Sequence, residues 1–118
     1  MKTISVETLR SWLEEGRNVS LVDVGPVEVR ELGAIPKSLY IVNAYEALKA
    51  HDTSVLANLS LPADRPVIAI CAAGKIASQV AAEQLTAQGF QVFVLEGGTR
   101  AWMAAGYPTE RPLDEQGE

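Results

Sequence analysis

The chain contains 118 residues, of which 47% are hydrophobic and 21% are charged, and its formal net charge is −5. This length is typical of one domain, and the hydrophobic content is enough to fill a core. There is no basic stripe, which argues against nucleic-acid binding, and no apolar run approaches the roughly 20 residues that a membrane-spanning helix needs. The single cysteine cannot form an internal disulfide. We therefore expect a reducing, cytoplasmic setting, with a disulfide to another chain as the alternative.

The first half of the chain shows alternating helical and extended patterns. Ser5 can cap a first helix, whose apolar positions Val6, Leu9 and Leu13 share one face. The β-rich run that follows stops at Gly25, which precedes a proline. The elements predicted here are a helix over residues 6–16, a strand over 19–24, a short helix over 27–32, a short strand over 39–42 and an irregular helical stretch over 44–59 that breaks near residues 52–53.

The second half contains the most informative junction of the chain. Cys71 closes the apolar run of residues 67–70, and an alanine-rich helical pattern begins at residue 75 or 76. This order predicts a strand, a tight loop and a helix, with the thiol at the end of the strand. The elements predicted here are the strand over 67–70, the helix from 75 or 76 to 88, a strand over 91–95 and a helix over 99–105. The inward stripe predicted for the long helix includes Ile76, Val80, Ala81 and Leu85.

The alternation of strands and helices indicates an α/β fold with a mainly parallel sheet. In open parallel sheets, ligands bind outside the carboxyl ends of the strands, which is where Cys71 is expected. A helix amino terminus at that place favours an anion, including a thiolate. We expect one domain over residues 1–108 and an acidic, flexible tail over residues 109–118.

Four short motifs occur in order between residues 3 and 108. They are Leu21-Val22-Asp23-Val24 continuing to Gly33-Ala34-Ile35-Pro36; the run of residues 67–70 leading into Cys71 with Gly74 three residues on; Ala81-Ala82 and Leu85 followed by Gly89-Phe90; and Leu95-Glu96-Gly97-Gly98 followed by Ala101-Trp102 and Gly106-Tyr107-Pro108. In combination, they resemble the single-domain rhodanese-like proteins, a sulfurtransferase fold. The resemblance implies a central, mainly parallel five-stranded sheet flanked by helices on both faces.

Several positions differ from the usual pattern of that family. In the cysteine loop, Ala72 and Ile76 occupy positions that often carry arginine, and Ala77 occupies one that is often serine. Lys75 is therefore the only cation of the loop. The scaffold and the thiol are retained, while several polar side chains are missing. Outside the loop, the departures are Gly25 for an arginine, Ala34 for a histidine and Lys37 for a glycine.

The resemblance implies sulfur transfer through a Cys71 persulfide. The Cys71 thiolate would take the outer sulfur of thiosulfate or a persulfide donor and pass it to a thiophilic acceptor, either a small molecule or a thiol-bearing protein. Lys75 is a candidate contact for an anionic donor, with a solvated lysine as the alternative. Asp23 either supports the loops near the site or makes structural hydrogen bonds to the backbone. Consecutive backbone N–H groups can form an anion-binding nest, and the candidates are those of Ala72, Ala73, Gly74, Lys75, Ile76 and Ala77.

Other kinds of site are poorly supported by the residues present. Cysteine phosphatases need an arginine six residues after the nucleophile, and Ala77 stands there. The one histidine, His51, lies outside every motif, so we expect neither a Cys–His pair nor a metal site or cofactor. The alternative to a sulfurtransferase is a degenerate rhodanese module with little turnover. Such a module would bind a partner, sense oxidants or carry sulfur from protein to protein.

Overall fold

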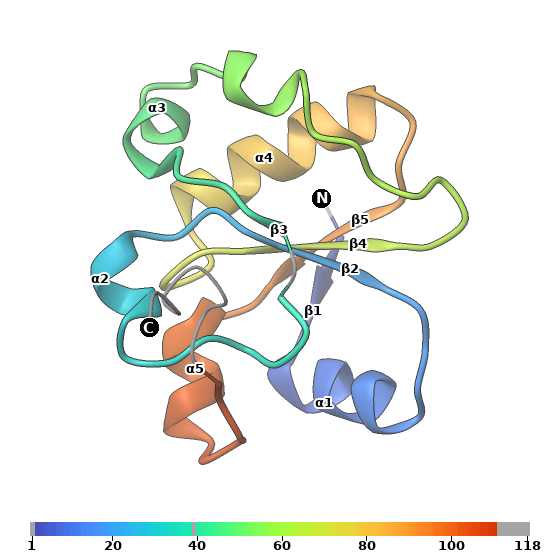
Figure 1. Cartoon of the computed structure of the whole chain (residues 1–118), viewed down its shortest axis with the longest axis vertical. Coiled ribbons are helices and arrows are strands. Elements are labelled where there is room, and N and C mark those ends of the chain that lie inside the picture. Colours follow the sequence, from blue (N-terminus) through green and yellow to red (C-terminus); the bar gives the residue numbers. More distant parts are fainter. Residues whose placement is uncertain (1, 39, 111–118) are drawn as a thin grey trace, which may run out of the picture.

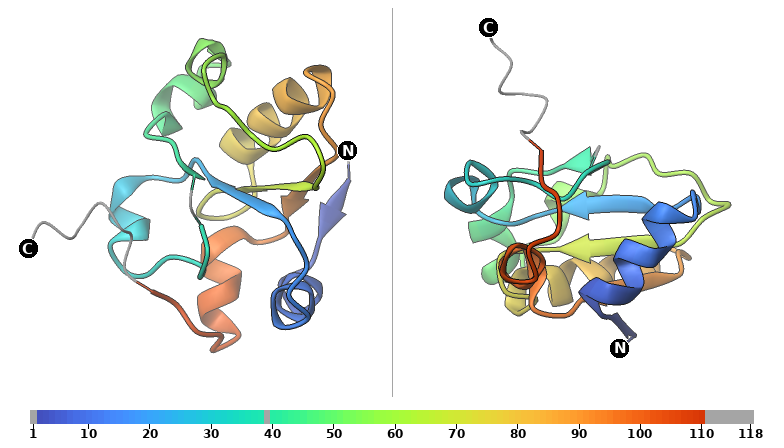
Figure 2. Two further views of the ribbon diagram at one scale, coloured as in Figure 1. Left: turned by 45° about the vertical axis from the view of Figure 1, so that its right-hand side comes forward. Right: turned by 90° about the horizontal axis from the view of Figure 1, so that it is seen from below.

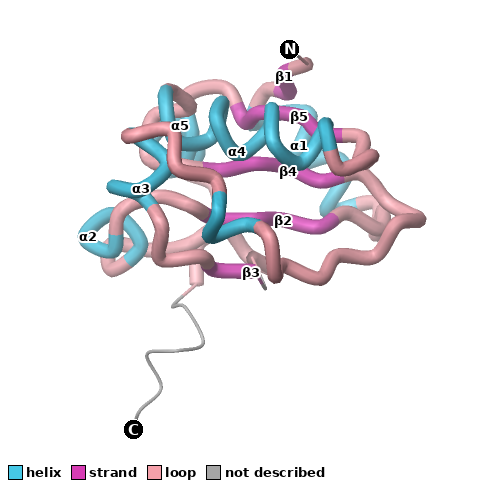
Figure 3. Tube along the Cα trace, turned by 90° about the horizontal axis from the view of Figure 1, so that it is seen from above, coloured by secondary structure: helices cyan, strands magenta, loops and turns pink. Residues whose placement is uncertain are grey.

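The computed structural model describes residues 2–38 and 40–110, and within them the strands form one parallel five-stranded sheet. The strand order is β1-β5-β4-β2-β3, which can be followed from top to bottom in Figure 3. Every crossover between parallel neighbours carries helical structure, as expected for this architecture. The strands are β1 (Thr3–Ile4), β2 (Ser20–Asp23), β3 (Tyr40–Ile41), β4 (Val67–Ile70) and β5 (Val92–Leu95).

Helices cover both faces of the sheet. Helix α4 (Ile76–Ala87) and α3 (Tyr45–Lys49) lie on one face, while α1 (Val6–Glu14) and α5 (Gly98–Ala104) lie on the other (Figures 1 and 2). The short helix α2 (Val27–Arg30) lies at the carboxyl ends of the strands. A single 3₁₀ turn, Ser54–Leu56, also follows α3 within the described residues. The predicted α/β class, the parallel five-stranded sheet and its two-sided covering by helices are therefore confirmed.

The central strand β4 supplies side chains to both cores. Val67 and Ala69 join the cluster that packs under α3 and α4, whereas Ile68 and Ile70 join the cluster under α1 and α5. All four side chains are fully buried. A strand buried on both faces reads as a continuous apolar run, and this is why the sequence around residue 67 shows no alternation. Because successive side chains point to opposite faces, one short strand anchors both layers of helices.

Most predicted elements are confirmed with shorter ends, and α5 begins and ends one residue earlier than predicted. Two details differ from the prediction. Strand β1 was not predicted, because its two residues are too few to show a period. The irregular stretch over 44–59 does break as expected, into α3 and the 3₁₀ turn. The inward placement of Ile76 is wrong, since this side chain is 51% exposed. Ile76 is the first residue of α4, and Ala77 and Ser78 face the core in its place.

The predicted acidic tail is only partly within the described region. Glu110 forms an antiparallel bridge with Ala34, with N···O distances of 2.8 Å in both directions. Thr109 lies beside it, and a Cβ on Gly33 would stand 2.8 Å from the Thr109 hydroxyl oxygen. The chain is therefore paired with the domain at residue 110. The remainder of the predicted tail, residues 111–118, lies outside the described residues.

Among the described helices, none has both the length and the apolar character needed to cross a membrane. The longest is α4, with 12 residues. Its buried side chains include Leu85, which is fully enclosed between the helix and the sheet. A substitution at Leu85 can therefore measure how much the packing of α4 against the sheet contributes to the free energy of unfolding.

We expect Leu85→Ala to lower the free energy of unfolding by about 2–5 kcal/mol, because it removes buried methyl groups and leaves a cavity. The matched control is Leu32→Ala, since Leu32 is 68% exposed and its truncation leaves no cavity. That control should change the free energy by no more than about 0.5 kcal/mol. Urea unfolding of both variants makes the measurement. Equal losses in the two variants would contradict the burial described for α4.

Candidate active site

Cys71 lies directly after β4, at the carboxyl edge of the sheet, as the sequence predicts. The thiol is free and only 3% exposed. The loop after Cys71 bends through residues 72–75 before α4 begins at Ile76. Neighbouring strands end beside it: β2 leads into Gly25, and β5 leads into the Gly97–Gly98 turn. This edge, together with α2 and the first turns of α4 and α5, lies on the left-hand side of Figure 1.

Helix α5 holds the cysteine loop through its backbone. The Thr99 N–H donates to the Cys71 carbonyl oxygen and the Arg100 N–H donates to that of Ala72, each at 2.9 Å. Gly98 makes this approach possible, because a Cβ there would stand 2.1 Å from the Cys71 carbonyl oxygen. Its φ of +60° also suits glycine. The Gly97–Gly98 pair thus turns the chain tightly from β5 into α5 beside the cysteine loop.

The other side of the loop is packed against Gly25. A Cβ at this position would stand 3.3 Å from both the Ala72 nitrogen and the Cys71 Cα atom. A larger residue would therefore contact the loop tightly and require its backbone to shift by a few tenths of an ångström. The Cys71 backbone is consequently packed between Gly25 on one side and α5 on the other.

The loop presents a row of backbone N–H groups. Within the described residues, none of the N–H groups from Ala72 to Ala77 donates a hydrogen bond to another part of the chain. Gly74 lets the loop curl, with a φ of +71° and space for a Cβ blocked by the Leu95 carbonyl oxygen at 2.6 Å. Successive free N–H groups at a helix start form an anion-binding concavity. The backbone can therefore supply the donors that the side chains of Ala72, Ile76 and Ala77 lack.

A cavity of about 320 Å³ opens over Cys71. Pro26, Tyr45 and the residues of the cysteine loop contribute to its lining. Three cationic side chains also line the cavity: Lys75 from the loop, Lys49 from α3 and Arg100 from α5. Lys75 and Cys71 therefore line the same cavity.

Ser78 lies against the thiol. Its Oγ is 3.2 Å from the Cys71 Sγ and 3.3 Å from the Lys75 carbonyl oxygen, and the residue is fully buried. With a neutral thiol, Cys71 donates to Ser78 and Ser78 donates to the carbonyl. A serine hydroxyl has one hydrogen and can rotate it. When Cys71 is ionised, the Ser78 hydroxyl can instead donate its hydrogen to the sulfur anion. Within the described residues, Ser78 is the one side chain with a hydrogen bond to the Cys71 side chain.

Asp23 and Arg30 form a buried ion pair behind the loop. Asp23 is 1% exposed and Arg30 is 4% exposed, and their closest atoms, Arg30 Nη1 and Asp23 Oδ1, are 3.8 Å apart. Asp23 Oδ1 also accepts from the Gly25 N–H at 2.9 Å. Arg30 donates to the Gly25 carbonyl oxygen at 2.6 Å and to the side chain of Asn43. Asp23 therefore makes a hydrogen bond to the backbone of the segment that follows β2, beside Cys71.

Burial sets the protonation behaviour of this pair. Loss of solvent raises the pKa of the Asp23 carboxyl above its ordinary value, while the Gly25 N–H and the Arg30 guanidinium act in the opposite direction. Within the described residues, Asp23 Oδ2 has no hydrogen-bond partner. The carboxylate is therefore tolerated mainly because Arg30 and Gly25 face its other oxygen.

Three residues of this region were missed in the sequence: Arg30, Ser78 and Arg100. A signal existed for Arg100, because it lies in the first turn after a strand that neighbours β4 and must emerge at the same edge. Ser78 lies in the first turn of α4, on the face that this helix turns to the core. His51 is exposed, as expected for a residue outside every motif.

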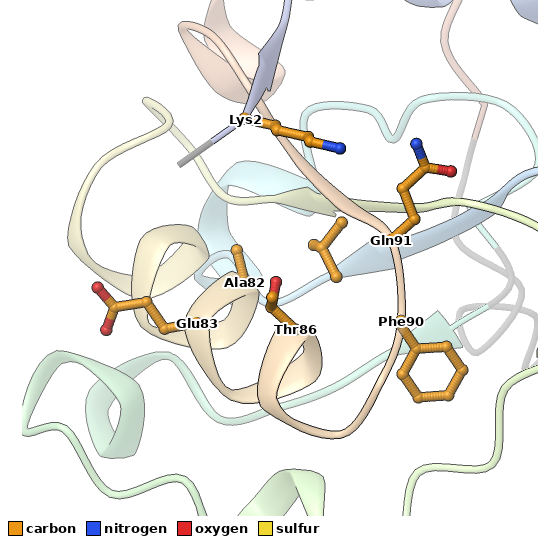
Figure 4. Close-up of a pocket in the computed structure, with 7 residues that line it drawn as sticks. Lys2, Ala82, Glu83, Thr86, Phe90 and Gln91 are labelled. Atoms are coloured by element: carbon orange, nitrogen blue, oxygen red, sulfur yellow. The ribbon is translucent and has the colours of Figure 1, made fainter.

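A second hollow of about 440 Å³ lies at the opposite ends of the strands, near the start of β5 and the end of α4. Figure 4 shows that the Lys2 amine and the Glu83 carboxylate there point away from one another. It contains no nucleophilic thiol, and Phe90 and Thr86 contribute to its wall. Across residues 2–38 and 40–110, no cluster of His, Cys, Asp and Glu is able to hold a metal ion. The Cys71 cavity is therefore the place where described residues bring a nucleophile and cations together.

The family assignment follows from the match of this scaffold and loop to known proteins. Residues 5–105 match the family described as "Rhodanese-like domain". The chain belongs to the rhodanese family. It is 34% identical to a rhodanese homologue of Thermus thermophilus, with a TM-score of 0.60, over 86% of this chain and all of that one.

Two further relatives carry functional names. A probable adenylyltransferase/sulfurtransferase, MoeZ, of Mycobacterium tuberculosis is 38% identical over 85% of this chain. The chain spans about a quarter of the length of that relative, since the match covers 24% of it. A thiosulfate sulfurtransferase of Pseudomonas aeruginosa is 28% identical, with a TM-score of 0.67, over 93% of this chain and 19% of that one. In each of these two relatives, therefore, the match covers only one portion of the longer chain.

We expect Arg30→Leu to lower the free energy of unfolding by about 3 kcal/mol near neutral pH, because it leaves Asp23 charged, buried and without its cation. The folded protein then holds the Asp23 proton more tightly than the unfolded chain does. Uptake of that proton stabilises the folded state, so the loss should shrink as the pH falls from about 7 to about 5. Urea unfolding at both pH values makes the measurement, with Arg65→Leu as a control at an exposed pair. A loss independent of pH would contradict the role given to Asp23.

We expect Ser78→Ala to slow the alkylation of Cys71 by iodoacetamide at neutral pH by about three- to tenfold, because the sulfur anion loses its hydrogen-bond donor. Ser20→Ala is the matched control, since Ser20 is also a buried serine but begins β2 at the far end of the sheet. The control should keep the alkylation rate of the parent protein. Equal rates in the parent and both variants would contradict the hydrogen bond proposed from Ser78 to the sulfur anion.

Proposed function

We propose that the chain is a sulfurtransferase that moves sulfane sulfur from thiosulfate or a persulfide donor to a thiophilic acceptor. The observation that supports this most directly is that Cys71, a free thiol, lines a cavity together with cationic residues and a loop of unengaged backbone N–H groups. Membership in the rhodanese family and the names of the sulfurtransferase relatives point to the same reaction class. The reaction requires a free thiol, which fits the cytoplasm or another reducing compartment.

The reaction proceeds in two balanced steps. The Cys71 thiolate attacks the outer sulfur of thiosulfate, the new bond joins the two sulfurs, and sulfite leaves with the electron pair of the broken sulfur–sulfur bond. The Cys71 persulfide anion then gives its outer sulfur to an acceptor such as cyanide or a thiolate, which returns Cys71 as a thiolate. No external oxidant or reductant is consumed in either step.

The loop supplies the stabilisation that each anion needs. The N–H groups of residues 72–77 and the amino terminus of α4 surround the position of the persulfide. Ser78 donates to the inner sulfur, and Lys75 contacts the donor anion. Asp23 supports the strand end next to the loop through Gly25 and takes no part in the chemistry.

A second candidate is a module that carries sulfur between proteins or binds a thiol-bearing partner with little turnover. The observation that favours it is the rim of the cavity, where Ile76 is half exposed beside Ala73 and where the loop lacks the side-chain donors common in the family. These apolar side chains, which lie beside the cations of the same cavity, suit contact with a protein partner. In this case the Cys71 persulfide still forms, but small acceptors discharge it slowly.

Incubation with thiosulfate, followed by intact-mass spectrometry, should show the gain of one sulfur atom by the protein. Cys71→Ser should show no gain, because the nucleophile is lost. Rapid release of thiocyanate on addition of cyanide identifies the general enzyme, and a stable adduct that only a protein thiol discharges identifies the carrier. If neither thiosulfate nor a polysulfide adds sulfur to the folded parent protein, the sulfurtransferase proposal fails.

A further inference from the structure

The mouth of the Cys71 cavity is positively charged although the whole chain has a net charge of −5. Lys75 and Arg100 are both exposed there. Within residues 2–38 and 40–110, no acidic side chain pairs with either of them. Lys49, the third cation, lies 3.9 Å from Glu46 Oε1 and is partly neutralised by it. Two uncompensated cations therefore face any molecule that approaches the thiol.

The backbone of Arg100 is hydrogen-bonded to the cysteine loop. Its N–H donates to the Ala72 carbonyl oxygen, and the preceding residue, Thr99, donates to that of Cys71. The side chain consequently starts from a point fixed to the cysteine loop, although it belongs to α5. An arginine supplied by α5 can replace the guanidinium groups that Ala72 and Ile76 do not provide. Sequence comparison within the loop alone would miss such a replacement.

We propose that Arg100 is a specificity-determining residue that favours anionic over neutral reagents at Cys71, an inference that rests on the proposed sulfurtransferase function. The reaction brings a thiolate against a dianion when the donor is thiosulfate, and these like charges repel one another. A guanidinium at the mouth offsets that repulsion and can bind two oxygens of the sulfonate end at once. Lys75 adds charge from the loop but cannot reproduce the forked geometry.

The test compares two alkylating reagents that differ in charge and share one reaction. Iodoacetate and iodoacetamide each transfer a two-carbon group to the Cys71 sulfur and release iodide, so their rate ratio reports the electrostatic preference of the mouth. We expect Arg100→Gln to lower the iodoacetate-to-iodoacetamide rate ratio by about three- to tenfold at low ionic strength. Arg100→Lys should retain most of the ratio. High salt should reduce the difference between parent and variant.

Arg65→Gln is the matched control, because it removes the same charge from the opposite end of β4. It should leave the rate ratio unchanged, and the iodoacetamide rate itself verifies that Cys71 is still presented correctly in each variant. An unchanged ratio in Arg100→Gln, or an equal fall in Arg65→Gln, would overturn the proposal.

The same variants separate this inference from the proposed function. If the parent protein gains sulfur from thiosulfate, the Michaelis constant for thiosulfate should rise in Arg100→Gln by a factor similar to the fall in the rate ratio. If the ratio falls as expected but no protein gains sulfur from any donor, Arg100 selects anions and the sulfurtransferase proposal is the one that fails. If sulfur transfer proceeds while the ratio does not change, only the role of Arg100 is lost.

Discussion

The close approach of α5 to the cysteine loop is the constraint on which the rest of the site depends. Gly98 has no Cβ, and this absence allows two consecutive N–H groups of α5 to reach the carbonyl oxygens of Cys71 and Ala72. Once these carbonyls are engaged, the opposite sides of the same peptide units are free to present their N–H groups to the cavity. The anion cradle is therefore a consequence of packing between two layers, and the side chains of the loop can vary without abolishing it.

The fold could be predicted from the sequence because its signals are local. The apolar run of β4, the alanine-rich helix after it and the glycines that end the elements each act within about a dozen residues. Strand β1 escaped prediction because two residues show no period, and its identity depends on pairing with β5. The outward turn of Ile76 was hidden for a related reason, since the first turn of a helix can lie beyond the core that its later turns cover.

The candidate site divides in the same way. Cys71, Gly74 and Lys75 were visible in one motif, and Asp23 was visible as a polar residue at a strand end. Arg30 was not visible, because its ion pair with Asp23 forms only when α2 folds against the end of β2. Ser78 and Arg100 acquire their positions from a helix turn and from a neighbouring strand. Residues that act through contacts between elements have no fixed spacing in sequence, which is why a motif search leaves them out.

The order of the strands determines when the surroundings of Cys71 can form during synthesis. Thr3 and Ile4 pair with Val94 and Leu95, so β1 can join the sheet only after β5 has been synthesised. The partners of the Cys71 carbonyl and of Ala72 are also made about thirty residues after the cysteine itself. A nascent chain that ends before α5 carries the thiol without its cradle. Such long-range closure slows folding, and it couples the reactivity of Cys71 to completion of the domain.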